Sequence, residues 1–293
     1  MSRVHDALRR AEQRGTSVGE AAEAVGTYTV EGRVLPSLAA FLAEVQEVPY
    51  TPAPEALLID SNRRQDPPGE EFRTLRTRLN HLQKLQPIRS VVVTSPSPAE
   101  GKSFTATNLA LAESQLSGSY ALLADFDLRR PVIHNLFGIE RSPGLTDYLM
   151  GKASLAEIIK KIAGVNLCVM PAGATSKDAL ELLNLPEVKS LIGDVCKMFS
   201  WVVLDSPPLL LSADANLLGT LTDGTILVVR IGSTTIEMVT RAMQSLCENN
   251  VLGVVVNGAR AGELYSKYTY YYSRYRYSHK PEEPEAEGAE PAS

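Results

Sequence analysis

The strongest constraint on the fold is a series of short, largely apolar runs that alternate with helical patterns. Six such runs lie at residues 91–94, 121–125, 167–170, 201–205, 225–229 and 252–256. Strands that are apolar throughout need cover on both faces, which is typical of a parallel sheet connected by helices. The sequence therefore predicts an α/β fold with a mostly parallel sheet and helices on both faces. In such sheets, ligands bind at the carboxyl ends of the strands.

Composition divides the chain into three segments. Residues 1–68 are predicted to form a flexible arm with one short amphipathic helix, because Val4, Ala7, Leu8 and Ala11 recur at helical spacing. Residues 69–262 carry the alternating pattern and are predicted to form the domain, beginning with a helix over 70–85. Residues 263–293 form a tail that is first tyrosine-rich and then acidic and proline-containing. Such a tail cannot build a packed core, and we expect it to be disordered.

Bulk properties limit the functions that the chain can have. The 293 residues are 44% hydrophobic, which supports a full core, and the net charge of -5 gives no global basic field for nucleic acid. The three cysteines, Cys168, Cys196 and Cys247, lie far apart in apolar stretches, which favours reduced thiols and the cytoplasm. No secretory signal and no run of about 18 apolar residues is found. Membrane contact is therefore expected only through a partner.

A phosphate-binding loop is predicted directly after the first apolar run. Residues 95–103 read SPSPAEGKS and lead into a helix, so that the loop amides and the positive helix end can hold phosphate. Lys102 would reach the β- and γ-phosphates, and the Ser103 hydroxyl would bind magnesium. Pro96 stands where the general motif has its first glycine. The loop alone is therefore a moderate match, and other residues must support it.

Aspartates stand at the ends of two further runs. Asp125 and Asp127 lie at the end of one run, and Asp205 ends another. A carboxylate at the end of an apolar strand is costly to bury unless it is paired or near a metal, and phosphate-bound magnesium is one natural partner. Helix capping, or a salt bridge to Arg129 or Arg130, would explain any one of them. These alternatives explain all three less well.

Tyrosines are concentrated in the tail. Seven of the eleven tyrosines fall within the thirteen residues 265–277, in a polar context without core periodicity. They are Tyr265, Tyr268, Tyr270, Tyr271, Tyr272, Tyr275 and Tyr277. Because Lys267, Arg274 and Arg276 are interspersed among them, stacking on single-stranded nucleic acid is one alternative, but no separate binding surface accompanies it. Packing in an interface would explain one or two tyrosines, and it does not explain seven.

The phosphate loop, the Asp125 to Pro131 motif and the motif around Asp205 together resemble the bacterial tyrosine kinases of capsule and exopolysaccharide synthesis, which have a P-loop NTPase-like fold. The similarity covers about residues 70–277. Residues 70–76 read EEFRTLR and match the family's E-x-x-R-x-x-R oligomerisation motif through Glu70, Arg73 and Arg76. The tyrosine cluster is similar to the family's autophosphorylation tail.

Partitioning and division-site ATPases share this fold. They carry an additional lysine five positions before the main lysine, where this chain has Ser97. That difference favours the kinases. The kinase family usually has glycine where this chain has Ala99, so the loop backbone must tolerate a Cβ atom there, and we expect strain or lowered affinity if its φ is positive.

The resemblance implies a protein-tyrosine autokinase that uses ATP and Mg²⁺. Its implied catalytic residues are Lys102, Asp125, Asp127 and Asp205, with Ser103, Asp125 and Asp205 holding magnesium and Asp127 orienting the incoming tyrosine. Nucleotide contacts are expected from Pro98, Ala99, Glu100, Gly101, Lys102, Ser103, Phe104 and Asn257. A contact from Asn257 to adenine and a turn before Gly258 fit its position equally well. The phosphoacceptors would be the seven tail tyrosines.

The resemblance also implies partners and a place in the cell. In the family, a segment of a membrane polysaccharide co-polymerase acts as an adaptor that activates the kinase, and the kinase forms homo-oligomers that include rings. The expected location is therefore the cytoplasm, peripheral to the inner face of the membrane through this partner. Protein tyrosines are the expected substrates, and no nucleic acid is expected. The alternative function is a non-kinase P-loop ATPase switch that organises partners at the membrane.

Overall fold

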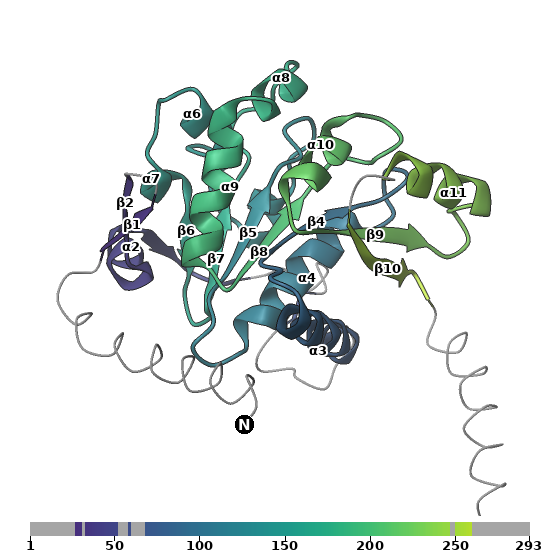
Figure 1. The fold of residues 1–293 in the computed structure, drawn as a ribbon, viewed down its shortest axis with the longest axis horizontal. Coiled ribbons are helices and arrows are strands. Elements are labelled where there is room, and N and C mark those ends of the chain that lie inside the picture. Colours follow the sequence, from purple (N-terminus) through teal and green to yellow (C-terminus); the bar gives the residue numbers. More distant parts are fainter. Residues whose placement is uncertain (1–26, 31–32, 52–57, 60–67, 247–249, 260–293) are drawn as a thin grey trace, which may run out of the picture.

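The computed structural model describes residues 27–30, 33–51, 58–59, 68–246 and 250–259. Its centre is an eight-stranded sheet in the order β10-β9-β4-β8-β5-β7-β6-β3 (Figure 1). The strands are β3 (Gln46–Val48), β4 (Ser90–Thr94), β5 (Ala121–Asp125), β6 (Lys160–Ile162), β7 (Leu167–Met170), β8 (Trp201–Asp205), β9 (Gly224–Arg230) and β10 (Val251–Asn257). Neighbouring strands are parallel except for β6 and β7. A small antiparallel sheet is formed by β1 (Thr27–Val30) and β2 (Arg33–Pro36).

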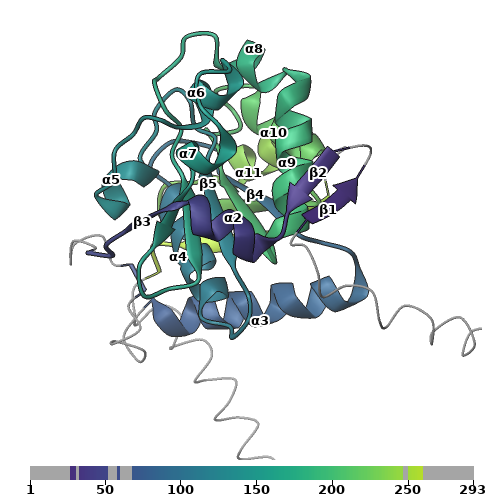
Figure 2. The same ribbon diagram turned by 90° about the vertical axis from the view of Figure 1, so that its left-hand side faces the viewer.

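Helices cover both faces of the large sheet (Figures 1 and 2). On one face lie α2 (Leu38–Glu44), α6 (Leu145–Leu149), α7 (Leu155–Ile158), α8 (Ala179–Leu183), α9 (Pro186–Met198) and α10 (Asp214–Leu221). On the other lie α3 (Gly69–Leu85), α4 (Lys102–Ser114) and α5 (Ile133–Phe137), while α11 (Ile236–Ser245) packs near β9. Successive strand residues enter opposite cores: Val92 lies in the first, and Val91 and Val93 lie in the second. The predicted layered α/β architecture is confirmed.

Part of the predicted arm belongs to the main fold. β3 pairs in parallel with β6 at the end of the large sheet, and the Phe41 ring of α2 meets Phe199 edge to face at a centroid distance of 6.4 Å. Ile59 is also buried in the second core. Apolar side chains at these positions drive the packing, which the irregular sequence pattern did not reveal. The boundary near residue 68 remains a prediction, and the predicted helix around Val4 lies outside the described residues.

A buried polar network joins α3 to the far end of α4. Both carboxylate oxygens of Glu113 accept hydrogen bonds from Asn80 Nδ2, at 3.1 and 2.8 Å. Asn80 Oδ1 in turn accepts from the Trp201 indole at 3.2 Å, and Arg76 Nη1 donates to the Ala112 carbonyl at 2.8 Å. Glu113 is fully buried, and this burial raises the pKa of its carboxyl to about 7, against the opposing effects of Asn80 and Arg76.

We predict that Glu113 makes the protein less stable as pH rises. The carboxyl titrates near its ordinary 4.5 when unfolded and near 7 when folded, so the folded state holds more protons between these values. The free energy of unfolding should fall across this window by roughly 3 kcal/mol. Glu113→Gln should remove that slope, as measured by urea unfolding at several pH values. Glu71→Gln changes an exposed carboxylate of α3 and serves as the control, and an unchanged slope in Glu113→Gln would contradict the assignment.

None of the described helices is long and apolar enough to cross a membrane. Of the cysteines, Cys168 and Cys196 are free thiols, and Cys247 lies outside the described residues. The tail tyrosines also lie outside them, so their role stays a prediction.

Candidate active site

The candidate site lies at the carboxyl ends of β4, β5 and β8, three neighbouring strands of the sheet. A pocket of about 540 Å³ opens there. Its lining residues are Pro98, Ala99, Gly101, Lys102, Ser103, Phe104, Asp127, Arg129, Arg130, Val132, Pro207, Pro208, Leu211 and Ser212. The pairing of β5 with β8 aligns Asp125 with Asp205, which explains why acidic side chains from distant parts of the sequence meet. A pocket therefore lies at the edge of the sheet where the sequence predicts that a ligand binds.

The phosphate loop turns sharply into α4 through two residues with left-handed backbone. Gly101 caps the helix at a φ of 97°, and Ala99 has a φ of 61°. A Cβ atom on Gly101 would overlap Asn257 Nδ2, so any other residue there would displace the Asn257 side chain as well as strain the backbone. Ala99 is the only residue other than glycine with a positive φ in the described ranges. The expected strain at Ala99 is therefore present in the backbone.

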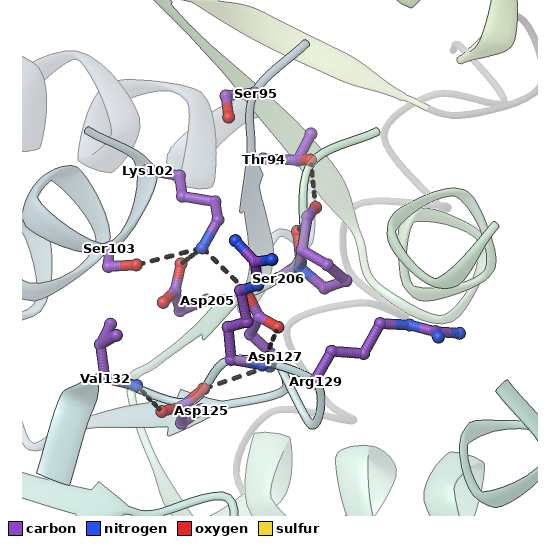
Figure 3. A network of polar contacts seen from close by, with 12 residues as sticks. Thr94, Ser95, Lys102, Ser103, Asp125, Asp127, Arg129, Val132, Asp205 and Ser206 are labelled. Carbon is purple, nitrogen blue, oxygen red and sulfur yellow. Dashed lines mark hydrogen bonds and ion pairs between the residues drawn. The ribbon is translucent and has the colours of Figure 1, made fainter. Parts of the chain in front are cut away.

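Lys102 is the electrostatic centre of the site (Figure 3). Its Nζ atom lies 3.0 Å from Asp127 Oδ2 and 3.9 Å from Asp205 Oδ1, and it donates to Ser103 Oγ at 3.2 Å. Burial alone would lower the pKa of Lys102, but the charges of Asp205 and Asp127 outweigh it and raise the pKa above its usual value. The side chain therefore stays charged at the floor of the pocket.

Asp125 is held by the backbone that follows it. Its Oδ1 accepts from the Asp127 amide at 3.1 Å, and its Oδ2 accepts from the Val132 and Ile133 amides at 3.0 and 3.1 Å. Burial and the neighbouring Asp205 charge raise the pKa of this carboxyl. Both oxygens thus fix the turn into α5. This leaves Asp125 less available than Asp205 as a direct metal ligand.

Asp205 offers the better fit to magnesium. The residue is fully buried, and neither of its carboxylate oxygens accepts a hydrogen bond of normal geometry from the part of the chain that the structure describes. Burial raises the pKa of the Asp205 carboxyl, while Lys102 and Ser103 oppose this. No group of three or more His, Cys, Asp or Glu side chains in the described ranges could hold a metal alone. A site with few carboxylates suits Mg²⁺, which usually takes one or two of them together with phosphate oxygens and water.

Asp127 contacts the lysine and lines the pocket beside it. Its Oδ2 accepts from Lys102 Nζ, and its Oδ1 accepts from the Arg130 amide at 2.9 Å. Asp127 lines the pocket, whereas Asp125 and Asp205 do not. Among the three aspartates, Asp127 is therefore the one in reach of a group that enters the pocket.

Comparisons with known proteins show the family to which the chain belongs. No protein-family model matches the chain. Over 205 residues, which are 69% of this chain and 86% of the relative, the sequence is 36% identical to the tyrosine-protein kinase YwqD of Bacillus subtilis. The chain belongs to the bacterial P-loop tyrosine kinases. It is a protein-tyrosine kinase.

Solved structures agree with this family. The chimerical protein CapA2B2 has a TM-score of 0.65 at 25% identity, covering 72% of this kinase and 91% of that chain. The kinase domain of the Escherichia coli tyrosine kinase ETK has a TM-score of 0.63 at 31% identity, covering 66% and 76%. The septum site-determining protein MinD of Pyrococcus horikoshii, at 22% identity and a TM-score of 0.50, shares the fold alone. The kinase spans 31% of the length of the curated relative EpsB of Ralstonia solanacearum.

Two predicted nucleotide-binding residues of this kinase do not line the pocket. The Glu100 side chain is buried, and Asn257 Nδ2 donates to the Glu100 carbonyl at 3.0 Å. Asn257 Oδ1 also accepts from the Gly258 amide at 2.8 Å, as expected of a turn. Phe104 lines the pocket and packs against Phe72 of α3, with a centroid distance of 5.8 Å. The remaining predicted loop residues all line the pocket.

The sequence did not identify the part of the pocket wall that lies outside the phosphate loop. Arg129 forms a salt bridge with Asp214, with contacts of 2.8 and 3.3 Å, so its main partner is not one of the three aspartates of the site. Arg130, Pro208 and Leu211 complete this wall, and Leu211 is 68% exposed. The double arginine after Asp127 and the double proline after Asp205 were the available signals, but only the fold shows that they face one pocket.

The predicted oligomerisation residues occupy different environments on α3. Glu70 and Arg73 form an ion pair at 3.0 Å, in which the Glu70 side chain is 75% exposed. Arg76 instead contacts the Ala112 carbonyl of its own chain. An intermolecular role for the three residues stays a prediction.

We predict that Ala99→Gly raises the stability of the folded protein. The left-handed backbone at Ala99 is present without nucleotide, so its cost of about 1–2 kcal/mol falls on folding rather than on ATP binding. Part of the gain is lost to the greater freedom of glycine in the unfolded chain, so the free energy of unfolding should rise by about 1 kcal/mol or less. Urea unfolding measures it, and titration with a fluorescent ATP analogue should show an affinity close to that of the wild type. An unchanged or lower free energy of unfolding would show that Ala99 is not strained.

Proposed function

We propose that this kinase transfers the γ-phosphoryl group of ATP to protein tyrosines, including those of its own tail, with Mg²⁺ as the metal ion. The observation that carries the proposal is the position of Lys102, which is buried beside Asp127 and Asp205 at the base of the phosphate loop. A cation at this point suits the negative charge of a transferring phosphoryl group. Phosphoryl transfer depends mainly on alignment and on such charge neutralisation.

In the proposed reaction, the phenolic oxygen of a tyrosine forms a bond to the γ-phosphorus, and the bond from that phosphorus to ADP breaks. Lys102 and the loop amides bind the phosphates, and the proton of the phenol passes to Asp127. Ser103 and Asp205 would hold Mg²⁺, directly or through water, with Asp125 supporting the site from the backbone turn. When bound, the metal would neutralise part of the phosphate charge.

Two aspartate variants test this division of roles. Asp127→Asn should lower the rate of phosphorylation by about 10²–10³-fold, which is the usual contribution of a general base, while ATP affinity changes little. Asp125→Asn should weaken ATP binding, because it removes a carboxylate that accepts three backbone amides. Separate measurement of ATP binding and single-turnover rates distinguishes the two. A larger binding loss in Asp127→Asn would reverse the assignment.

The course of the chain supports the tail as a substrate. β10 ends at Asn257, whose side chain contacts the phosphate loop, so the tail leaves the described domain beside the site. Tyr265 follows eight residues later. A link of this length spans at most about 26–29 Å when extended. A tether of this length supports the tail tyrosines as substrates, either in this pocket or in that of a neighbouring copy.

The experiment that tests the proposal compares ADP release with phosphotyrosine formation by the full chain. With ATP and Mg²⁺, the wild type should form both in equal amounts until its acceptors are filled, and Asp205→Asn should form little of either. ADP release without phosphotyrosine, even with an activating partner, would instead support an ATPase switch.

We further propose that the kinase regulates exopolysaccharide or capsule synthesis from the inner face of the membrane. The support is the likeness to the named kinases and to the chimerical protein CapA2B2. The proposed partner is a membrane polysaccharide co-polymerase, and deletion of residues 1–26, which keeps β3, Phe41 and Ile59 in the fold, should abolish recruitment but leave ATP binding. Normal recruitment of this truncated chain would exclude the arm as the docking element.

Self-assembly is proposed to use the exposed beginning of α3, including Glu70 and Arg73. Each phosphate adds about -1.5 to -2 charges, so several of them would turn the mildly basic tyrosine segment acidic. The acidic active sites of neighbouring copies would then repel this segment. Phosphorylation should therefore loosen the oligomer, which sizing before and after ATP treatment would show. Unchanged assembly after demonstrated phosphorylation would contradict this proposal.

A further inference from the structure

The loop between β9 and α11 is hydrogen-bonded to the phosphate loop. Arg230, the last residue of β9, donates from Nη1 to the Ala99 carbonyl at 3.0 Å. Four residues later, the Thr234 hydroxyl donates to Glu100 Oε1. A segment more than a hundred residues away in sequence therefore holds two consecutive residues of the phosphate loop.

Glu100 is unusual because it places a carboxylate in a loop that binds a polyanion. Its side chain is only 3% exposed and does not line the pocket, so it does not contact a ligand there. Instead its second oxygen, Oε2, accepts from the Ser97 amide at 2.8 Å, which closes the loop across three residues. The carboxylate thus acts within the loop and between the loop and Thr234.

Thr234 uses both hydrogen-bonding functions of its hydroxyl. The oxygen accepts from the Arg230 amide at 2.8 Å while the proton goes to Glu100. The Thr234 amide also donates to the Arg230 carbonyl at 3.0 Å, so a tight turn presents the hydroxyl. Loss of this hydroxyl would leave a buried carboxylate oxygen without that donor, and such loss costs more than the bond itself contributes.

The same contacts bear on the strained residue of the loop. The carbonyl that Arg230 holds belongs to Ala99, whose left-handed backbone is unfavourable for a residue with a Cβ atom. Asn257 holds the next carbonyl, that of Glu100. Fixed carbonyls on both residues keep the backbone in a conformation that an isolated loop would leave.

We propose that Glu100 and Thr234 are positioning residues, which together with Arg230 hold the phosphate loop in its nucleotide-binding shape before ATP arrives. The inference rests on the proposed ATP-dependent function and specifies how its loop is preorganised. Preorganisation raises affinity because the loop is already ordered when ATP binds, so the free-energy cost of ordering it does not reduce the free energy of binding.

Thr234→Val tests the inference, since valine keeps the shape of threonine and lacks the hydroxyl. ATP affinity should fall about tenfold or more, Thr234→Ser should restore most of it, and thermal unfolding of the ligand-free protein should show that both variants remain folded. Thr240→Val is the matched control, because the Thr240 hydroxyl bonds only to Ile236 of its own helix. Wild-type affinity in Thr234→Val, or failure of serine to restore it, would overturn the inference.

Glu100→Gln provides an independent measurement with opposite expectations. If the carboxylate mainly repels phosphate, removal of its charge should tighten ATP binding. If it positions the loop, binding should weaken severalfold, because the amide of glutamine cannot accept at both positions. Tighter binding would overturn the inference. Absence of ATP binding by the wild type itself would instead refute the proposed function, so the two failures are distinguishable.

Discussion

Lys102→Ala is expected to lower tyrosine phosphorylation by about 10²–10³-fold or more, which is the usual cost of removing one preorganised charge-stabilising group. The lysine is 12% exposed and sits beside Asp127 and Asp205. Without it, these carboxylates repel both one another and the incoming phosphates, because Lys102 is the cation that lies beside them. ATP binding should therefore weaken as well as turnover.

The control for this variant is Lys152→Ala, which removes an exposed lysine that does not line the pocket. Both proteins should be assayed for ATP binding and for single-turnover phosphorylation, after thermal unfolding has shown that each is folded. Retention of phosphorylation within tenfold of the wild type in Lys102→Ala would remove this residue from the proposed mechanism.

Gly101→Ala should weaken ATP binding on the order of 10²-fold. The left-handed backbone costs about 1–2 kcal/mol for alanine. The new Cβ atom would also displace the Asn257 amide, which lies 1.9 Å from its position. Displacement breaks the hydrogen bond to Glu100, worth about 1 kcal/mol, and the two costs together correspond to about this loss of affinity.

Gly118→Ala is a matched control for Gly101→Ala. Gly118 also has a left-handed backbone, with a φ of +73°, but a Cβ atom there meets nothing within 4 Å. It should lower stability slightly and leave ATP affinity unchanged. Equal ATP affinity in both variants would show that neither the conformation nor the contact at Gly101 matters for the nucleotide.

The sequence predicts the sheet well because its strands are marked by their own side chains. The run 201–205, for example, coincides with β8, and the run 121–125 coincides with β5. β3 and β6 were missed because three residues such as Gln46–Val48 carry too short a pattern to be recognised. Their place in the sheet depends on pairing with partners far away in sequence.

The site shows a similar division. Lys102 and Asp127 could be predicted because their motifs follow strands whose ends must meet at one edge of the sheet. The partners of Arg129 and Glu100 could not, since Asp214 and Thr234 lie far along the chain and carry no motif. Likewise, the sequence suggested strain at Ala99, but only the backbone supplies its φ of 61°.

The most direct test of the central claim is phosphopeptide mapping of the intact kinase after incubation with ATP and Mg²⁺. The wild type is predicted to acquire phosphate on tyrosines within residues 265–277. A variant with all seven of these tyrosines changed to phenylalanine should bind ATP normally and acquire no phosphate in this segment. A wild-type protein that binds ATP in the presence of its activating partner, yet forms no phosphotyrosine, would contradict the account.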